Sequence, residues 1–275
     1  MVNVSLLIEN KTYREKYVAE HGLSLFIEAG GKKILFDTGA SSLFAENAAK
    51  KRINLEDADF CVISHGHYDH TGGVPEFCRI NSKAPIYVHR DAFGDFYGSE
   101  DGKIDTRPCG IRWILEKKEK LEPRFVYTEE PVWITDDIAI SGTIPALGCE
   151  MPEIFYRKNE DGSYTEDDMS HEQFLAVRDE GKVYLFSGCS HKGIIPAIEY
   201  AKKLFPNDHL SVVLAGLHLY SADENQCKKA AEKLMDYNLD TVIPVHCTGL
   251  RAISKCMELM GEKCIPASSG ETLYL

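Results

Sequence analysis

The sequence predicts a layered α/β protein, and three observations support this. Strand-rich stretches in both halves of the chain are accompanied by helical stretches, a pattern typical of sheets covered by helices. The residues best suited to metal chemistry directly follow expected strands, and they are Asp37, His65–His70, Cys189–His191 and His246. The chain has 275 residues and is 44% hydrophobic, which is enough to bury a full core. We therefore expect one α/β sandwich domain spanning residues 1–275.

The first half begins with a hairpin and continues to a buried strand. Residues 23–28 and 33–36 are rich in β-forming side chains and flank the turn Gly30-Gly31. Residues 42–51 indicate a helix, and Phe60-Cys61-Val62-Ile63-Ser64 indicates a buried strand. Thr71-Gly72-Gly73 lets the backbone pass close to the loop after that strand, and residues 85–88 indicate another strand.

The segment from about residue 91 to residue 131 is the least regular part of the sequence. It carries Gly, Asp and aromatic residues without a clean period, apart from a short helical stretch near Trp113–Leu121. Connections of this length are usually functional or disordered. We expect this segment to be an irregular insertion over the active site.

The second half repeats the alternation of strands and helices. Residues 174–177 and 183–186 predict a hairpin, and residues 194–204 predict a helix that ends before Pro206. Residues 210–215 predict a strand, and Ser221-Ala222-Asp223-Glu224 is typical of a capping box that opens the next helix. Residues 241–245 predict a strand that ends at His246, and residues 250–260 predict a last helix that stops at Gly261.

The most informative motif is His65-Gly66-His67-Tyr68-Asp69-His70, which places three imidazoles and one carboxylate within six residues. It directly follows an expected buried strand, where binding groups gather in layered α/β folds. Histidine is the commonest metal ligand, and Asp supplies a hard oxygen. Alternate residues of an extended segment point the same way, so His65 and His67 can share one ion while Asp69 and His70 turn toward a second.

This hexapeptide resembles the HxHxDH motif of the metallo-β-lactamase superfamily. Further matches are Leu35-Phe36-Asp37-Thr38-Gly39, Phe186-Ser187-Gly188-Cys189 and Val245-His246-Cys247-Thr248-Gly249. A narrower set resembles the branch that includes the dihydropterin-aminobenzene-phosphate synthases and related metal-dependent hydrolases. That set is Glu20-His21-Gly22-Leu23-Ser24, Gly188-Cys189-Ser190-His191, Gly216-Leu217-His218-Leu219 and His246-Cys247-Thr248-Gly249. The resemblance implies an αββα sandwich of the metallo-β-lactamase type.

The resemblance also implies two divalent metal ions. His65 and His67 would bind the first ion, and Asp69, His70 and His246 would bind the second. The stretch from Gly142 to Glu153, where relatives usually place a third ligand of the first ion, contains no His. His191 is our preferred third ligand because it belongs to the branch motif, and His171 is the alternative. Zinc is the expected metal because imidazole and carboxylate ligands suit it, with iron and manganese as alternatives.

The remaining candidate residues have supporting or alternative roles. Asp69 is also the expected catalytic residue. Cys189 stands where most relatives place a bridging Asp, so it is either a soft thiolate ligand or a small buried residue. Asp37 is expected to orient a ligand His. His21 and His218 are expected to line the substrate pocket, although a structural role fits each equally well, and His89 and His209 are expected to be structural or exposed.

Composition limits the classes of partner. The formal net charge is -12, which disfavours a phosphate backbone as a partner, so no nucleic-acid partner is expected. No run of 18 apolar residues occurs, and Val4–Ile8 is too short for the core of a signal peptide, so we expect no membrane association. The 9 Cys form no CxxC pair, which favours reduced thiols in the cytoplasm.

The expected function is a binuclear metal-dependent hydrolase that uses an activated water on a small phosphorylated or pterin-like molecule. One alternative is a transferase that resembles the dihydropterin-aminobenzene-phosphate synthases. Another alternative is a non-catalytic metal-binding sensor. A di-iron oxygen or nitric oxide reductase is disfavoured because that branch has Glu where this chain has His67. The sequence does not indicate an oligomeric state.

Overall fold

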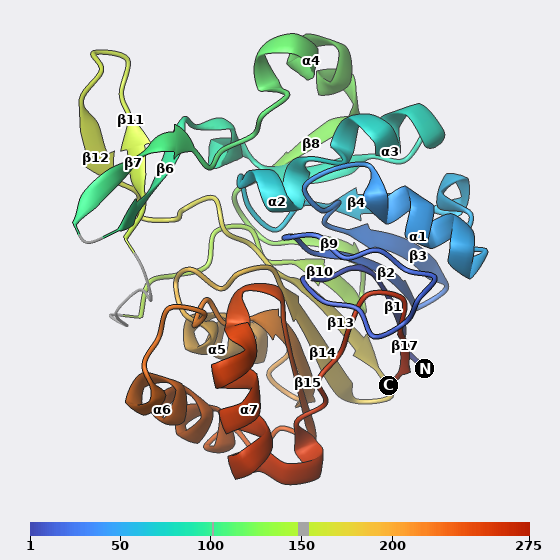
Figure 1. Ribbon diagram of the computed structural model, residues 1–275. Coiled ribbons are helices and arrows are strands. Elements are labelled where there is room, and N and C mark those ends of the chain that lie inside the picture. The colour runs from blue at the N-terminus through green and yellow to red at the C-terminus, as the bar shows by residue number, and fades with distance from the viewer. Residues whose placement is uncertain (101, 148–153) are drawn as a thin grey trace.

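Two sheets face each other, and helices cover their outer faces (Figure 1). The computed structural model describes residues 1–275 apart from residue 101 and residues 148–153. The first sheet has the strand order β17-β1-β2-β3-β4-β5-β8. Its strands are β1 (Asn3–Ile8), β2 (Ser24–Ala29), β3 (Lys32–Phe36), β4 (Phe60–Val62), β5 (Ile86–His89), β8 (Phe125–Thr128) and β17 (Thr272–Tyr274).

The second sheet has the strand order β16-β15-β14-β13-β10-β9. Its strands are β9 (Val132–Thr135), β10 (Ile138–Ile140), β13 (Leu175–Asp179), β14 (Lys182–Ser187), β15 (His209–Gly216) and β16 (Thr241–Val245). The pairs β14–β15 and β15–β16 are parallel. The carboxyl ends of β14, β15 and β16 therefore lie at the same end of the sheet. Most of the candidate site residues from the second half of the chain follow these strand ends.

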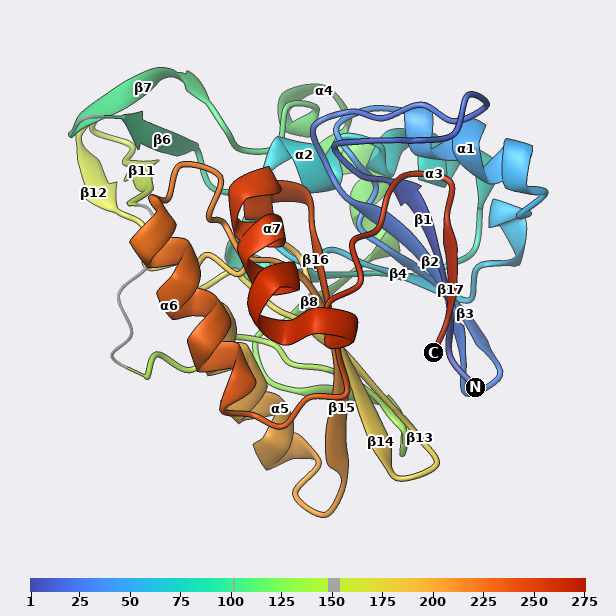
Figure 2. The same ribbon diagram turned by 60° about the horizontal axis from the view of Figure 1, so that its bottom comes forward.

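Helices on the two outer faces complete an αββα sandwich, as Figure 2 shows from a second direction. Those beside the first sheet are α1 (Leu43–Lys51), α2 (Tyr68–Thr71), α3 (Val74–Ile80) and α4 (Ile114–Leu121). Those beside the second sheet are α5 (Ile194–Leu204), α6 (Glu224–Met235) and α7 (Gly249–Met260). Short 3-10 turns are η1 (Leu55–Asp57), η2 (Arg90–Phe93), η3 (Glu122–Arg124), η4 (His246–Thr248) and η5 (Gly261–Lys263). The predicted fold class is confirmed.

Apolar side chains fill the spaces between these layers. Between the two sheets, Phe36 and Leu25 of the first meet Phe186 and Leu214 of the second, and all four are fully buried. Separate clusters lie between each sheet and its helices, around Phe77 on one side and Phe174 on the other. Burial of an apolar side chain of this size contributes about 1.5–3 kcal/mol, so the packed layers form a rigid support for the loops at the sheet edges.

A third, small sheet stands beside the sandwich and contains part of the segment that we expected to be irregular. Its strand order is β12-β11-β6-β7. These strands are β6 (Phe96–Glu100), β7 (Lys103–Pro108), β11 (Tyr156–Lys158) and β12 (Tyr164–Glu166). Residues 91–131 therefore carry a hairpin, α4 and the main-sheet strand β8, apart from residue 101, which lies outside the described residues. The partner of β6 is β11, where Tyr156 faces Tyr97, and this distant pairing has no local signature.

Local capping signals agree with most of the expected helix ends. Gly261 follows α7 with a φ of 58°, a left-handed conformation that favours glycine. The cap of α6 differs from our prediction by two residues. Its N-cap is Asp223, which accepts a hydrogen bond from the Gln226 N–H while the Gln226 side chain bonds back to the Asp223 N–H. The edge strand β17 of the first sheet and its inner neighbour β1 were not predicted.

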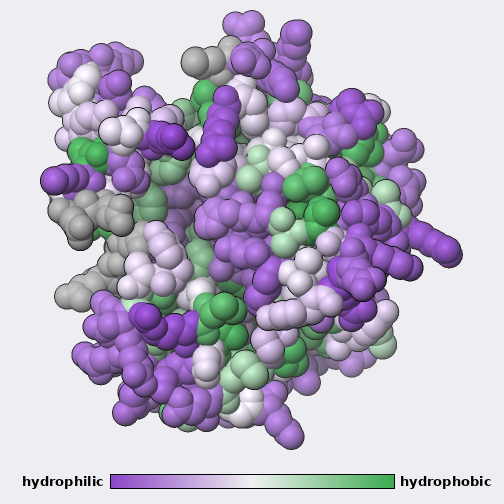
Figure 3. All heavy atoms as spheres, viewed as in Figure 1, coloured by the Kyte–Doolittle hydropathy of each residue, from purple (hydrophilic) through white to green (hydrophobic). Residues whose placement is uncertain are grey.

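The face of the molecule in Figure 3 is mainly hydrophilic, with hydrophobic residues in small separate groups. Exposed large apolar side chains include Tyr13, Tyr220 and Leu250, which come from different elements. Within the described residues, no helix combines the length and the apolar character needed to cross a membrane.

Candidate metal centre

The candidate site is built from loops that leave the two sheets at the same end. The loop after β4 carries Ser64 to His67, and α2 follows from Tyr68 with Asp69 and His70 inside it. The loops after β14 and β16 bring Cys189, His191 and His246 to meet them. The site therefore joins a contiguous motif from the first half to strand ends from the second half.

Three imidazoles form the first donor set. The ring centroids of His65, His67 and His191 lie 4.6, 4.7 and 4.9 Å apart, which makes a nearly regular triangle. His65 Nε2 lies 3.2 Å from His191 Nε2. All three side chains are buried.

The second donor set combines a carboxylate, two imidazoles and a thiol. Asp69, His70, Cys189 and His246 each offer one ligand atom, and these atoms lie within 4.8 Å of one another. His70 Nε2 is 3.1 Å from Cys189 Sγ and 3.2 Å from His246 Nε2. Cys189 also belongs to a group with His65 and His191, so its sulfur lies between the two donor sets.

Hydrogen bonds behind the rings fix which nitrogen faces the site. Asp37 Oδ2 lies 2.6 Å from His70 Nδ1 and 2.7 Å from the Ser64 hydroxyl, and a carboxylate can only accept. Because the Ser64 proton goes to Asp37, Ser64 Oγ accepts from His65 Nδ1 at 2.9 Å. His246 Nδ1 donates to Asn10 Oδ1 at 2.7 Å. In the neutral rings, the Nε2 lone pairs of these three histidines therefore point into the site.

This arrangement fits a bound metal. Lone pairs on facing Nε2 atoms repel unless a cation or proton lies between them, and such facing pairs occur in both donor sets. His67 Nε2 is buried and has no hydrogen-bond partner among the described residues. Buried polar atoms are normally satisfied, and a divalent ion among these donors would satisfy them together.

His171 lies beside the first donor set, but both of its nitrogens are used elsewhere. Its Nδ1 accepts a hydrogen bond from the Gly66 N–H at 3.1 Å, so its Nε2 carries the proton and donates to Asp167 at 3.0 Å. No lone pair remains for a metal, and the ring instead holds the loop between His65 and His67. This geometry favours His191 as the third ligand, although the assignment of the ligands stays a prediction.

Several supporting residues carry no signal in the sequence that would have identified them. The Glu172 carboxylate is fully buried and accepts the N–H groups of His191 at 2.6 Å and Lys192 at 3.0 Å. Glu9 accepts the His246 N–H at 2.8 Å across 237 residues of sequence. Only the fold brings Glu9 and Asn10 beside His246, because they directly follow the end of β1 at Ile8.

Burial and charge shift the pKa values of the donors in different directions. Burial lowers the pKa of His67 to about 3 and holds the pKa of His65 and His191 well below the usual range. Burial also opposes charge on His70, but Asp37 and Asp69 raise its pKa to about 9. Burial disfavours the Asp69 carboxylate, yet His70, His21 and His246 hold its pKa well below the usual range. The first set therefore presents neutral imidazoles, and the second presents an ionised carboxylate.

Uncommon backbone conformations gather around the site. Asp37, Ser190, His218 and His246 have φ values of 56°, 54°, 49° and 53°, in the left-handed region that non-glycine residues seldom occupy. Each lies at or just after the end of a strand. Such conformations cost about 1–3 kcal/mol each and cluster at functional sites.

A pocket of about 240 Å³ opens beside the donors, and both His21 and His218 line it. His21 Nε2 lies 3.2 Å from Asp69 Oδ2, so this exposed ring contacts the second donor set directly. Phe155 packs against His67, His191 and His218 at centroid distances of 4.9, 4.6 and 5.7 Å. Gly98, Ser99 and Asp105 come from the small sheet, so the hairpin forms one wall of the pocket.

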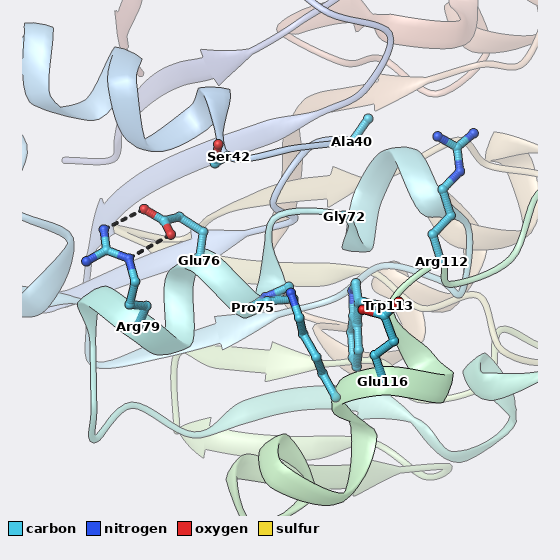
Figure 4. Close-up of a pocket in the computed structure, with 10 residues that line it drawn as sticks. Ala40, Ser42, Gly72, Pro75, Glu76, Arg79, Arg112, Trp113 and Glu116 are labelled. Atoms are coloured by element: carbon cyan, nitrogen blue, oxygen red, sulfur yellow. Dashed lines mark hydrogen bonds and ion pairs between the residues drawn. The ribbon is translucent and has the colours of Figure 1, made fainter.

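A larger cavity of about 450 Å³ lies between α3 and the start of α4, and it shares no lining residue with the first pocket (Figure 4). Glu76 and Arg79, which line it, are already paired with each other. Arg112 extends over the Tyr68 ring, with 3.6 Å between its guanidinium carbon and the ring centroid. The metal chemistry therefore belongs to the smaller pocket.

The fold and the clustered His, Asp and Cys side chains are typical of a metal-binding protein with an αββα sandwich. The family model of the metallo-beta-lactamase superfamily matches residues 18–142. The chain belongs to the metallo-β-lactamase superfamily, whose members are typically metal-dependent hydrolases. Proteins of this fold bind divalent metals.

Two relatives from Methanocaldococcus jannaschii and one crystal structure cover nearly the whole chain. The uncharacterized protein MJ0448 is 36% identical over 93% of this chain and 94% of its own length. A 7,8-dihydropterin-6-methyl-4-(beta-D-ribofuranosyl)-aminobenzene-5'-phosphate synthase is 30% identical over 90% of this chain and 87% of its own length. The crystal structure of Tm1679, a metal-dependent hydrolase of the beta-lactamase superfamily, superimposes with a TM-score of 0.85 at 26% identity, covering 100% of this chain and 99% of that one.

Proposed function

We propose that the protein is a binuclear metal-dependent hydrolase that acts on a small phosphorylated or pterin-like molecule. The observation that carries this proposal is the pair of donor sets that share Cys189 at the pocket. His65, His67 and His191 would hold one ion, and Asp69, His70, Cys189 and His246 the other. Two such ions, zinc by preference, would supply Lewis acidity and lower the pKa of a water.

The residues of the chain have separate tasks in this proposal. Asp69 is ionised and lines the pocket, so its carboxylate can accept a hydrogen bond from a water and orient it. His21 is raised in pKa, mainly by its hydrogen bond to Asp69, and is exposed, so it can return a proton to a leaving group. Phe155 covers the first donor set and restricts the approach of solvent.

The pocket limits the substrate. A volume of about 240 Å³ admits a small molecule or the reacting end of a larger one. Among the described residues that line it, none is Lys or Arg. The charge of a phosphoryl group would therefore be met by the proposed metal ions and by His21, not by a guanidinium clamp.

A transferase activity is the second candidate, and the relative named as a synthase favours it. The same site could activate a phosphorylated leaving group and direct another acceptor than water toward the substrate. A non-catalytic metal sensor is the third candidate. The three differ in whether turnover occurs and in the origin of the new oxygen in the product.

The test combines metal-loaded protein, a panel of phosphomonoesters, phosphodiesters, lactones and thioesters, and heavy-oxygen water. We expect turnover that a chelator abolishes, with one heavy oxygen in each product molecule. Asp69→Ala is the negative control. Turnover without label, dependent on an added acceptor, would support the transferase, and a full metal content without turnover on any substrate would support the sensor.

A further inference from the structure

Three metal-binding side chains occupy equivalent places at the ends of three neighbouring strands. The parallel strands β14, β15 and β16 end at Ser187, Gly216 and Val245, and Ser187 pairs with Ala215 while Gly216 pairs with Val245. Two residues beyond each end come Cys189, His218 and Cys247. Their ligand atoms lie within 4.8 Å of one another, and all three residues are buried. The regular register of the sheet therefore builds a Cys-His-Cys group.

Glycines allow these strand ends to approach closely. The Gly216 N–H donates to the Gly188 carbonyl at 2.7 Å, and the Leu219 N–H donates to the Cys247 carbonyl at 3.1 Å. A side chain at Gly216 would place its Cβ 2.5 Å from the Gly188 oxygen and 2.7 Å from Cys247 Sγ. Packing around Gly216 thus holds the Cys247 sulfur against the loop that carries Cys189.

The ligand atoms of Cys189, His218 and Cys247 are better suited to binding a thiophilic ion than to hydrogen bonding with one another. Thiols are weak donors and weak acceptors, so the hydrogen bonds of Cys247 with the Cys189 carbonyl at 3.7 Å and with the side chains of Cys189 and His218 hold the group only weakly. Tetrahedral zinc has Zn–S bonds of about 2.3 Å and Zn–N bonds of about 2.0 Å, which place its ligand atoms about 3.5–3.8 Å apart. Side-chain movements of less than about 1 Å would bring the three atoms to that spacing, with a water as the fourth ligand.

We propose that Cys189, His218 and Cys247 form a third metal position, which takes a soft divalent ion such as Zn²⁺. Its thiolate Cys189 is shared with the second donor set, so this position adjoins the two proposed ions. His218 and Cys247 belong to neither donor set of the proposed hydrolytic site. The proposal therefore does not depend on which reaction the protein catalyses.

The test compares metal content and cobalt spectra of the whole protein and of three variants. Cys247→Ser removes one thiolate at nearly constant volume. His218→Asn removes the imidazole and retains a residue that tolerates the left-handed backbone at this position, where φ is 49°. Cys256→Ser is the matched control, because Cys256 is a buried cysteine of α7 that packs among Ala231 and Cys264.

We expect the wild type and Cys256→Ser to bind one more ion per chain than Cys247→Ser and His218→Asn, in titrations with Zn²⁺ or Co²⁺. In the cobalt form, the thiolate-to-metal charge-transfer absorption should fall by about half in Cys247→Ser, since Cys189 remains. Equal metal content and equal charge-transfer absorption in all four proteins would overturn the proposal. If circular dichroism shows that Cys247→Ser does not fold, the metal content and charge-transfer absorption of His218→Asn decide the test.

Discussion

The two halves of the chain contribute to the site in contrasting ways. The first half supplies four donors from one hexapeptide. Asp37 accepts hydrogen bonds from the Ser64 N–H, the Ser64 hydroxyl and His70, and these bonds hold the loop and its rings in place. The second half supplies Cys189, His191 and His246 from loops that lie far apart in sequence. Its donors are positioned by sheet register and by buried carboxylates, such as Glu172 behind His191.

This difference predicts how the two halves respond to substitution. A donor in the hexapeptide shares its support with its neighbours, so its loss should weaken binding without moving the loop. Apart from Cys189, which lies between the two donor sets, a donor of the second half has its own support, so a change there should affect one ion at a time. Substitutions in both halves test this difference in response, and the largest effect is expected at Asp69.

Asp69→Ala should abolish turnover and lower the affinity of the second ion by more than about 100-fold, since even residues behind the ligands contribute 10- to 100-fold. Asp69 is the carboxylate of its set, and its pKa lies well below the usual range, so the ion loses a full negative charge. Circular dichroism should be unchanged because Val62 and Ile63 still pack in the core. The measurements are turnover and metal content, with Asp105→Ala, an exposed carboxylate of the same pocket, as the control.

Wild-type turnover and full metal content in Asp69→Ala would show that Asp69 is not a required ligand and that the site works by another arrangement. Asp69→Asn separates charge from shape, because it keeps the side chain's size and removes only its charge. We expect it to lose the ion as Asp69→Ala does.

His191→Ala should release the first ion, whereas His171→Ala should retain both ions. The His171 nitrogens are both engaged, with the Gly66 N–H and with Asp167, while His191 Nε2 faces His65 Nε2 at 3.2 Å. Metal analysis after gel filtration distinguishes the two variants. If His171→Ala loses an ion and His191→Ala keeps both, the assignment of the first set is wrong.

Asp37→Asn should weaken metal binding by about 10- to 100-fold, the usual effect of changing a group that orients a ligand. An Asn side chain accepts only through its oxygen. If its NH₂ group takes the Oδ1 position, the bond from the Ser64 N–H is lost; if it takes the Oδ2 position, the bonds from His70 and the Ser64 hydroxyl are both lost. Competition with a coloured chelator measures the affinities. Glu172→Gln is the matched change in the second half, and it should affect the first ion alone.

Much of the fold could be predicted because its signals are local. The strands β2, β3, β14 and β15 show hydrophobic runs bounded by turn residues, and α7 ends at a glycine with the expected positive φ. The pairing of β6 with β11 and of β1 with β17 joins segments that are distant in sequence. The residue pattern within one of these strands does not show which distant strand it pairs with. The sequence around the small sheet therefore indicates only an irregular insertion.

The candidate site likewise contains some residues that the sequence identifies and others that only the fold reveals. The hexapeptide is recognisable because its donors are contiguous, and His246 because it ends a strand. Asn10, Glu9 and Glu172 are ordinary polar residues in the sequence, and only the fold shows that they support His246 and His191. Both nitrogens of His171 form hydrogen bonds, one with the Gly66 N–H and one with Asp167. The sequence does not reveal these bonds, so motif spacing alone does not choose between His171 and His191 as a ligand.

The smallest expected effect concerns His89, a buried imidazole of the first half that lies outside both donor sets. Its Nε2 lies 2.7 Å from the Thr143 hydroxyl, its Nδ1 accepts the Asp91 N–H, and burial lowers its pKa below the ordinary 6.5. The unfolded chain therefore binds more protons at this position between its folded pKa and pH 6.5. The stabilisation is fully present above pH 6.5 and is lost as the pH falls through that window.

His89→Gln should change the free energy of unfolding by about 1 kcal/mol or less at pH 8, because Gln can still hydrogen-bond to Thr143. Below pH 6.5 the variant should lose stability less steeply than the wild type, since one fewer group takes up a proton on unfolding. Urea unfolding of the metal-loaded proteins at pH 8, 6.5 and 5.5 measures this difference, and His209→Gln, which alters an exposed imidazole, is the control. Parallel pH profiles for His89→Gln and the wild type would show that His89 titrates alike in the folded and unfolded chains. In that case burial by itself would not keep an imidazole of the first half neutral, and the neutrality of His65 and His67 would have to come from the bound ions.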